Sequence, residues 1–91
     1  MSKYSIDQQI KFNFEISKLC AYFRKKVIRI TLREMSIKSG IPVATLSSFE
    51  QGRSSNLKFL YIYLVSCETQ EHKKFFIDRF REILERSFYS D

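Results

Sequence analysis

The side chains that could do covalent or metal chemistry are few and scattered in this chain. It contains one histidine, His72, and two cysteines, Cys20 and Cys67, which form no CxxC pair. A structural zinc site needs four such ligands, and nucleophilic catalysis needs a base beside the nucleophile. The sequence also has no glycine-rich phosphate loop, and its carboxylates are dispersed among lysines. It therefore predicts a protein that is not an enzyme and that uses no cofactor and no metal.

Positive charge is the chemical feature that stands out. The formal net charge is +6, and residues 1–64 carry eleven basic side chains against four acidic ones. In the densest segment, 24–38, six basic side chains are opposed only by Glu34. Such a segment attracts a polyanion such as nucleic acid; the alternative is that these side chains only solvate helix faces. The six are Arg24, Lys25, Lys26, Arg29, Arg33 and Lys38.

Helices are predicted to position these residues. Two glycines and one proline are too few for the turns of a β-sandwich or barrel, so an all-α fold is expected. Apolar residues recur at intervals of three and four, which is the helical period. Thr31 and Thr69 are placed to cap helix starts, and Gly40 and Gly52 to end helices. The expected helices cover 6–26, about eight residues after Thr31, 43–51, 56–66 and 70–88.

Residues 31–64 resemble the helix-turn-helix of the Cro and phage-repressor family, also called the XRE family. The features that match, in order, are Thr31 at the cap, Met35-Ser36, Gly40 in the turn, Thr45-Leu46-Ser47, Glu50 and Gly52-Arg53. With the flanking helices, the likeness covers residues 6–66. It implies a single five-helix domain, 1–91, which has a lambda-repressor-like helix-turn-helix core and an extra C-terminal amphipathic helix.

The resemblance also implies which residues touch DNA. The helix at 43–51 would enter the major groove and read bases; its outward residues are Val43, Ala44, Thr45, Ser47 and Ser48. None of these is Arg, Lys, Asn or Gln, so readout would depend on thymine methyl contacts and on DNA shape. The residues placed near phosphates are Thr31, Arg33, Arg53, Ser55, Asn56, Lys58, Arg29 and Lys38.

Two apolar features lie outside this scheme. Ile37 stands where the family usually has a polar residue, and we expect it to pack on Val27, Ile28 or Ile30. The C-terminal helix has more apolar side chains than a small body readily covers, so we expect part of it to form a homodimer interface. The alternative is that it packs wholly on its own core. The proposed interface residues are Phe76, Phe80, Ile83, Leu84 and Phe88.

These observations favour a sequence-specific transcriptional regulator, a small dimeric repressor of phage, plasmid or mobile-element type that binds double-stranded operator DNA. The alternative is a protein-interaction module, an antitoxin or antirepressor, that uses the same helices to grip a protein partner. No apolar run approaches the roughly 18 residues of a membrane span, so we expect no membrane partner and a cytoplasmic location. Both cysteines are expected to be reduced and buried.

Overall fold

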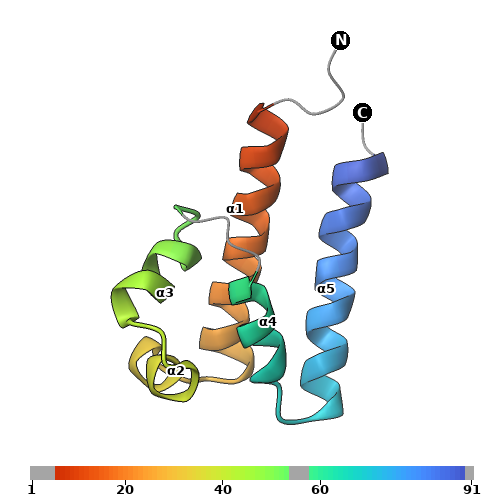
Figure 1. Ribbon diagram of the computed structural model, residues 1–91. Helices are drawn as coiled ribbons and strands as arrows, with labels where there is room; N and C mark the ends of the chain where they lie inside the picture. The colour runs from red at the N-terminus through yellow and green to blue at the C-terminus, as the bar shows by residue number, and fades with distance from the viewer. Residues whose placement is uncertain (1–5, 54–57, 90–91) are drawn as a thin grey trace.

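The computed structural model describes residues 6–53 and 58–89. All regular structure in this part of the chain is helical (Figure 1), which confirms the expected all-α, five-helix domain. No helix in the described ranges is both long and apolar enough to cross a membrane. The helices are α1 (Ile6–Tyr22), α2 (Leu32–Ser39), α3 (Val43–Glu50), α4 (Lys58–Val65) and α5 (Gln70–Tyr89), and α1 runs directly into η1 (Phe23–Val27), a π-helical turn.

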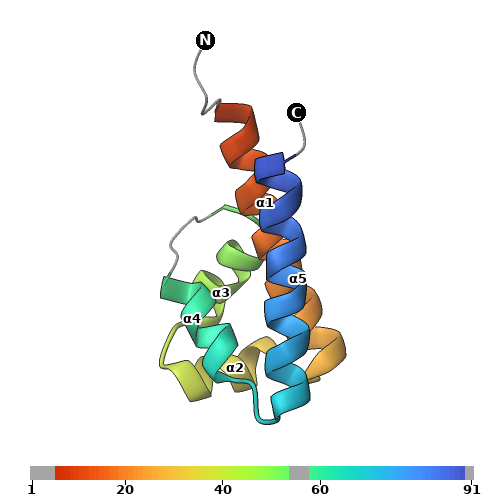
Figure 2. The same ribbon diagram turned by 90° about the vertical axis from the view of Figure 1, so that its right-hand side faces the viewer.

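The two longest helices, α1 and α5, lie side by side and run in opposite directions, and the three short helices gather against them (Figures 1 and 2). Aromatic rings join the two long helices near the end of α1. Phe23 meets Phe76 edge to face, with ring centroids 4.9 Å apart, and Tyr22 stacks on Phe75 at 6.2 Å. The pair of long helices is therefore the support on which α2, α3 and α4 are placed.

One apolar core receives side chains from every helix. Phe23, Met35, Leu46 and Tyr63 are completely buried, and they come from η1, α2, α3 and α4 in turn. From α5, Phe76 and Ile83 join the same cluster. Cys20 and Cys67 are both free and buried, as expected.

The start and end of α2 follow the sequence signals. Thr31 Oγ1 accepts a hydrogen bond from the Glu34 amide at 3.0 Å, and the Thr31 amide donates back to Glu34 Oε1 at 3.2 Å. This reciprocal capping box satisfies two amides that a helix start leaves unpaired. Gly40 ends the helix with φ of +74°, and its amide donates to the Ser36 carbonyl.

Gly52, which follows α3, is expected to tolerate substitution less well than Gly40. Both have positive φ, +79° and +74°, so alanine at either site costs about 1–2 kcal/mol of backbone strain. A Cβ on Gly52 would also lie 3.0 Å from Phe14 Cδ2, whereas a Cβ on Gly40 would meet nothing within 4 Å. Urea denaturation should therefore show a larger loss of unfolding free energy for Gly52→Ala than for Gly40→Ala, and equal losses would contradict the contact with Phe14.

The first helix differs from the expected continuous α-helix over 6–26. Its last turn is a π-helix, in which the Ile28 amide donates to the carbonyl of Phe23, five residues back, at 3.0 Å. The segment then leaves the helix through Arg29, which has a φ of +53°. The wider turn changes which side chains face inward, and it places Arg24 in the interior.

Candidate nucleic-acid interface

The helices α2 and α3 form a compact unit that rests on α1. They contact each other across the turn 40–42, and Met35 and Leu46 are completely buried at their junction. Phe49, at the end of α3, is buried against Phe59 and Tyr63 of α4, with ring centroids 5.3 and 5.8 Å away. The position of α3 is thus fixed from beneath by apolar packing.

The outward residues of α3 remain accessible to solvent. Val43 and Ala44 are exposed at the start of the helix, and Thr45, Ser47 and Ser48 are half-buried along it. We call these five residues the α3 outer face. None of them belongs to the buried core, so the residues predicted to read bases all reach the surface, two of them exposed and three half-buried.

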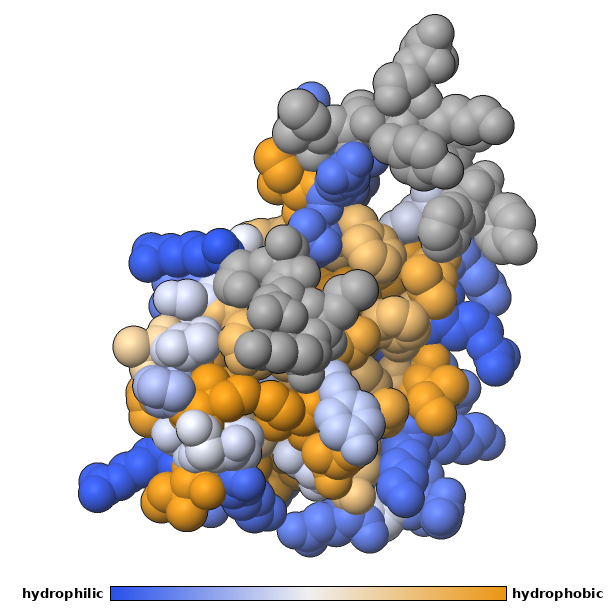
Figure 3. All heavy atoms as spheres, in the orientation of Figure 1, coloured by the Kyte–Doolittle hydropathy of each residue, from blue (hydrophilic) through white to orange (hydrophobic). Residues whose placement is uncertain are grey.

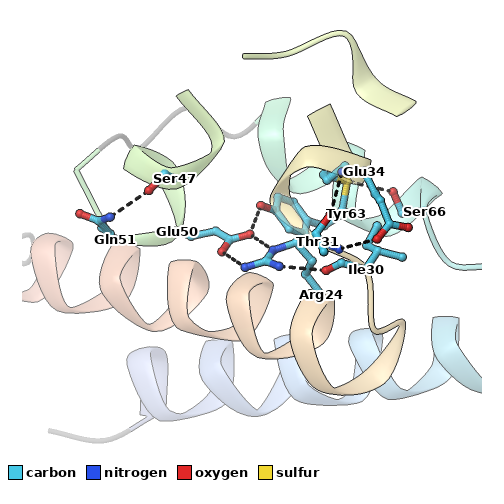
Figure 4. A network of polar contacts seen from close by, with 10 residues as sticks. Arg24, Ile30, Thr31, Glu34, Ser47, Glu50, Gln51, Tyr63 and Ser66 are labelled. Atoms are coloured by element: carbon cyan, nitrogen blue, oxygen red, sulfur yellow. Dashed lines mark hydrogen bonds and ion pairs between the residues drawn. The ribbon is translucent and has the colours of Figure 1, made fainter. Parts of the chain in front are cut away.

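Gln51 extends this face and was missed by the sequence analysis, which stopped at Ser48. Gln51 is exposed, and its Nε2 donates a hydrogen bond to Ser47 Oγ at 2.9 Å (Figure 4). It follows Ala44 and Ser47 by seven and four residues, so the three lie on one side of the helix. That spacing in the sequence was the signal that could have identified it. A glutamine amide can bond adenine through two hydrogen bonds, unlike the five predicted side chains.

Exposed cations lie at the start of α2 and after α3. Arg29 and Arg33 are exposed beside Thr31, and a surface hollow lined in part by Lys25, Arg29 and Thr31 lies there. Arg53 is exposed directly after α3.

Three of the other predicted phosphate contacts lie wholly or partly outside the described residues, and the fourth is in an ion pair. Ser55 and Asn56 fall outside the described ranges, and Lys58 is the first residue of α4, with its side chain outside the description. Lys38 is exposed, and its Nζ lies 3.4 Å from Glu68 Oε1.

Arg24 must be removed from the predicted basic surface. Only 5% of the residue is exposed, and its Nε and Nη2 donate to the two carboxylate oxygens of Glu50 at 2.7 and 2.9 Å. Its Nη1 donates to the Ile30 carbonyl at 2.9 Å. The hydrogen bond to Glu50 raises the pKa of Arg24, so its charge is permanent and is already neutralised within the fold.

Tyr63 completes this buried polar cluster. Its hydroxyl donates to the Glu50 carboxylate oxygen that also accepts from Arg24 Nε (Figure 4). Burial, followed by the hydrogen bond to Glu50, raises the pKa of Tyr63. The cluster ties the end of α3 to η1 and α4, so its chemical role is to orient α3.

Ile37 does not pack as expected. It is 75% exposed on α2, whereas Val27, Ile28 and Ile30 are half-buried and pack against the core. Ile37 is therefore a solvent-exposed apolar side chain on α2, and Val43 is a second one at the start of α3.

The predicted dimer residues on α5 divide into two groups. Phe76 and Ile83 are 2% and 5% exposed in the core of the same chain, so they are not available to a second subunit and their assignment was wrong. They turn inward because α5 uses this side of the helix to pack on α1. Phe80 and Leu84 are half-buried, and the Phe88 side chain lies outside the described part of the structure.

Comparison with known proteins adds no relative. The chain matches no protein-family model, no curated protein and no solved structure.

Proposed function

We propose that this protein is a sequence-specific DNA-binding transcriptional regulator, a small dimeric repressor of the phage, plasmid or mobile-element type. The observation that supports this most is the α3 outer face, which lies at the solvent-accessible surface and is preceded and followed along the chain by exposed cations, at the start of α2 and directly after α3. An α-helix fits the major groove of B-DNA, and cations on either side of it suit the phosphates that border the groove.

Base reading is assigned to α3. The methyl groups of Val43, Ala44 and Thr45 suit contact with thymine methyls, while the Ser47 and Ser48 hydroxyls suit hydrogen bonds to several bases. Gln51 adds an amide that is oriented by its hydrogen bond to Ser47. Because most of these contacts discriminate weakly, DNA shape and a second subunit would supply much of the specificity and affinity.

Phosphate binding is assigned to the flanking cations, with Arg33 on one side and Arg53 on the other. Each neutralised phosphate releases counterions, so binding weakens as salt rises. The buried Arg24–Glu50 pair supports this arrangement indirectly, since it holds the end of α3 that precedes Arg53.

The proposal is tested by selecting binding sites from fragmented genomic DNA and then measuring affinity against salt. We expect Arg53→Ala to weaken binding to all sequences and to reduce the slope of log affinity against log salt by about 0.9 for each subunit, or about 1.8 for the dimer. We expect Thr45→Ala to change sequence preference at the base pair that this side chain contacts, by less than the about 1–3 kcal/mol that a bidentate contact provides. The control is Lys11→Ala, which removes an exposed cation from the first half of α1 and should change neither quantity.

Equal effects of Arg53→Ala and Thr45→Ala on every sequence would remove the base-reading assignment. Failure of the wild-type protein to retain any sequence over random DNA would overturn the regulator proposal itself.

Exposure of Ile37 favours a second candidate function, that of an antitoxin or antirepressor which grips another protein. Transfer of the exposed Ile37 side chain from water into an apolar contact with another protein would be favourable. A stable stoichiometric protein partner that co-purifies with the wild-type chain, and that Ile37→Lys releases, would favour this function over DNA binding alone.

A further inference from the structure

Helix α5 has a side that no other described helix covers. It lies on the outside of the molecule, in front of the remaining helices in Figure 2. At the edge of this side, Ile77 is 49% exposed and Leu84 is half-buried, and Phe80 is half-buried because part of its ring packs against the chain's own core. These three residues form what we call the apolar row. Apolar surface gathers over neighbouring α4 and between α4 and α5 in Figure 3. On α4, Val65 is 55% exposed.

Four charged residues flank the apolar row along α5. They recur at intervals of four, three and four, so they share one helix face, and their signs alternate. All four are exposed, and none forms an ion pair with another described residue. We call them the charge row: Lys74, Asp78, Arg81 and Glu85.

We propose that the apolar row and the charge row bind the same rows of a second copy of this chain, with the two α5 helices antiparallel. A twofold axis that passes between the two α5 helices, level with the midpoint of Arg79 and Phe80, sets Lys74 opposite Glu85 of the second copy. The same axis sets Asp78 opposite Arg81 of the second copy. Symmetry repeats both contacts, so every charge in the row meets an opposite charge, as an isologous interface requires.

The same axis also interleaves the apolar row. At a rise of about 1.5 Å per residue, Ile77 of the second copy falls midway between Phe80 and Leu84, about 3 Å along the helix from each. Side chains staggered in this way pack as knobs into holes. The charged and apolar patterns thus select one register independently. The C-terminal half of the second α5 then lies beside α4 and covers part of its exposed apolar surface.

This self-association specifies the dimer that the proposed regulator needs, but its formation requires no DNA. It drops the buried residues Phe76 and Ile83 from the predicted interface, keeps the half-buried Phe80 and Leu84, and adds the exposed Ile77 and the charge row. Dimerisation is measured without DNA, so its result is separate from that of the DNA-binding experiment. A monomeric protein would contradict the α5 interface, and a dimer that binds no specific DNA would contradict the proposed function.

The test uses two variants of the full chain, with mass determined by sedimentation equilibrium over a range of concentrations. Lys74→Glu/Arg81→Glu makes the charge row entirely negative, and Asp78→Lys/Glu85→Lys makes it entirely positive. Each variant alone should dimerise about a hundredfold more weakly than wild type, because four attractive rim contacts become repulsive. Mixed in equal amounts, they should form a one-to-one heterodimer.

The matched control is Lys25→Glu/Lys26→Glu, which changes net charge as much as the negative variant at exposed residues of η1 and should remain dimeric. The proposal is overturned if wild type stays monomeric, if either row variant dimerises like wild type, or if the mixture forms no heterodimer. If the charge row only stabilises its own helix through pairs four residues apart, both row variants would associate as wild type does and their mixture would form no heterodimer.

Discussion

Replacement of Arg24 by alanine is expected to lower the free energy of unfolding by about 3–5 kcal/mol, because it leaves the buried Glu50 carboxylate without its cation. The Arg24 and Glu50 side chains are both only 6% exposed, so water cannot replace the lost hydrogen bonds. Since small domains are stable by about 5–15 kcal/mol, this loss is a large part of the total stability. Urea denaturation followed by circular dichroism measures the change.

Two further variants separate this buried pair from ordinary surface charge. Lys38→Ala breaks the exposed pair with Glu68, whose side chains are 48% and 74% exposed, and should cost less than about 1 kcal/mol. The double variant Arg24→Met/Glu50→Gln removes both charges and should recover most of the stability lost in Arg24→Ala. A loss below about 1 kcal/mol for Arg24→Ala would show that the pair does not hold α3 in place.

Stability is also expected to fall steeply above pH 9, by about 4 kcal/mol in total between pH 8 and 11. Burial raises the pKa of Cys20 above its ordinary value of 9.0 and that of Tyr63 above 10.0. Above those values the unfolded chain releases both protons while the folded chain retains them. The free energy of unfolding then falls by about 1.4 kcal/mol per pH unit for each group. Well below pH 9 both groups keep their protons in both states, so this decrease is absent.

The two groups can be distinguished by substitution. Tyr63→Phe should be less stable at neutral pH, because Glu50 loses a hydrogen bond, but its stability should fall less steeply with pH above 10. Cys20→Ala should reduce the part of the decline that begins near pH 9; Cys67, whose pKa is also raised by burial, contributes to the part that remains. Denaturation curves at several pH values test this, and unchanged slopes in both variants would show that these groups ionise in the folded state.

Local signals in the sequence predicted most of the helix boundaries. Thr31 with Glu34, and the glycines at 40 and 52, depend on hydrogen bonds and backbone angles within a few residues, so the sequence records them directly. The π-helical turn 23–27 was missed because the apolar spacing of α1 continues through it. The residue that the turn places in the interior, Arg24, binds the Glu50 carboxylate, which lies 26 residues further along the chain.

The candidate site was predicted less completely than the fold. The α3 outer face follows from helical spacing alone, whereas the burial of Arg24 depends on how α1, α3 and α4 meet. The apolar residues of α5 cover a wide arc, and sequence spacing cannot tell which part faces the chain's own core. The structure assigns Phe76 and Ile83 to that core and leaves Ile77 exposed.

The π-helical turn at Phe23–Val27 restricts how the length of this chain can change. Loops usually tolerate insertions and deletions, but a deletion here would rewind the turn as an α-helix and swing the side chain at position 24 away from Glu50. During evolution, a deletion within Phe23–Val27 would therefore require replacement of the buried Glu50 carboxylate as well. Gaps in future alignments of related sequences should therefore avoid this segment wherever the arginine and glutamate are retained.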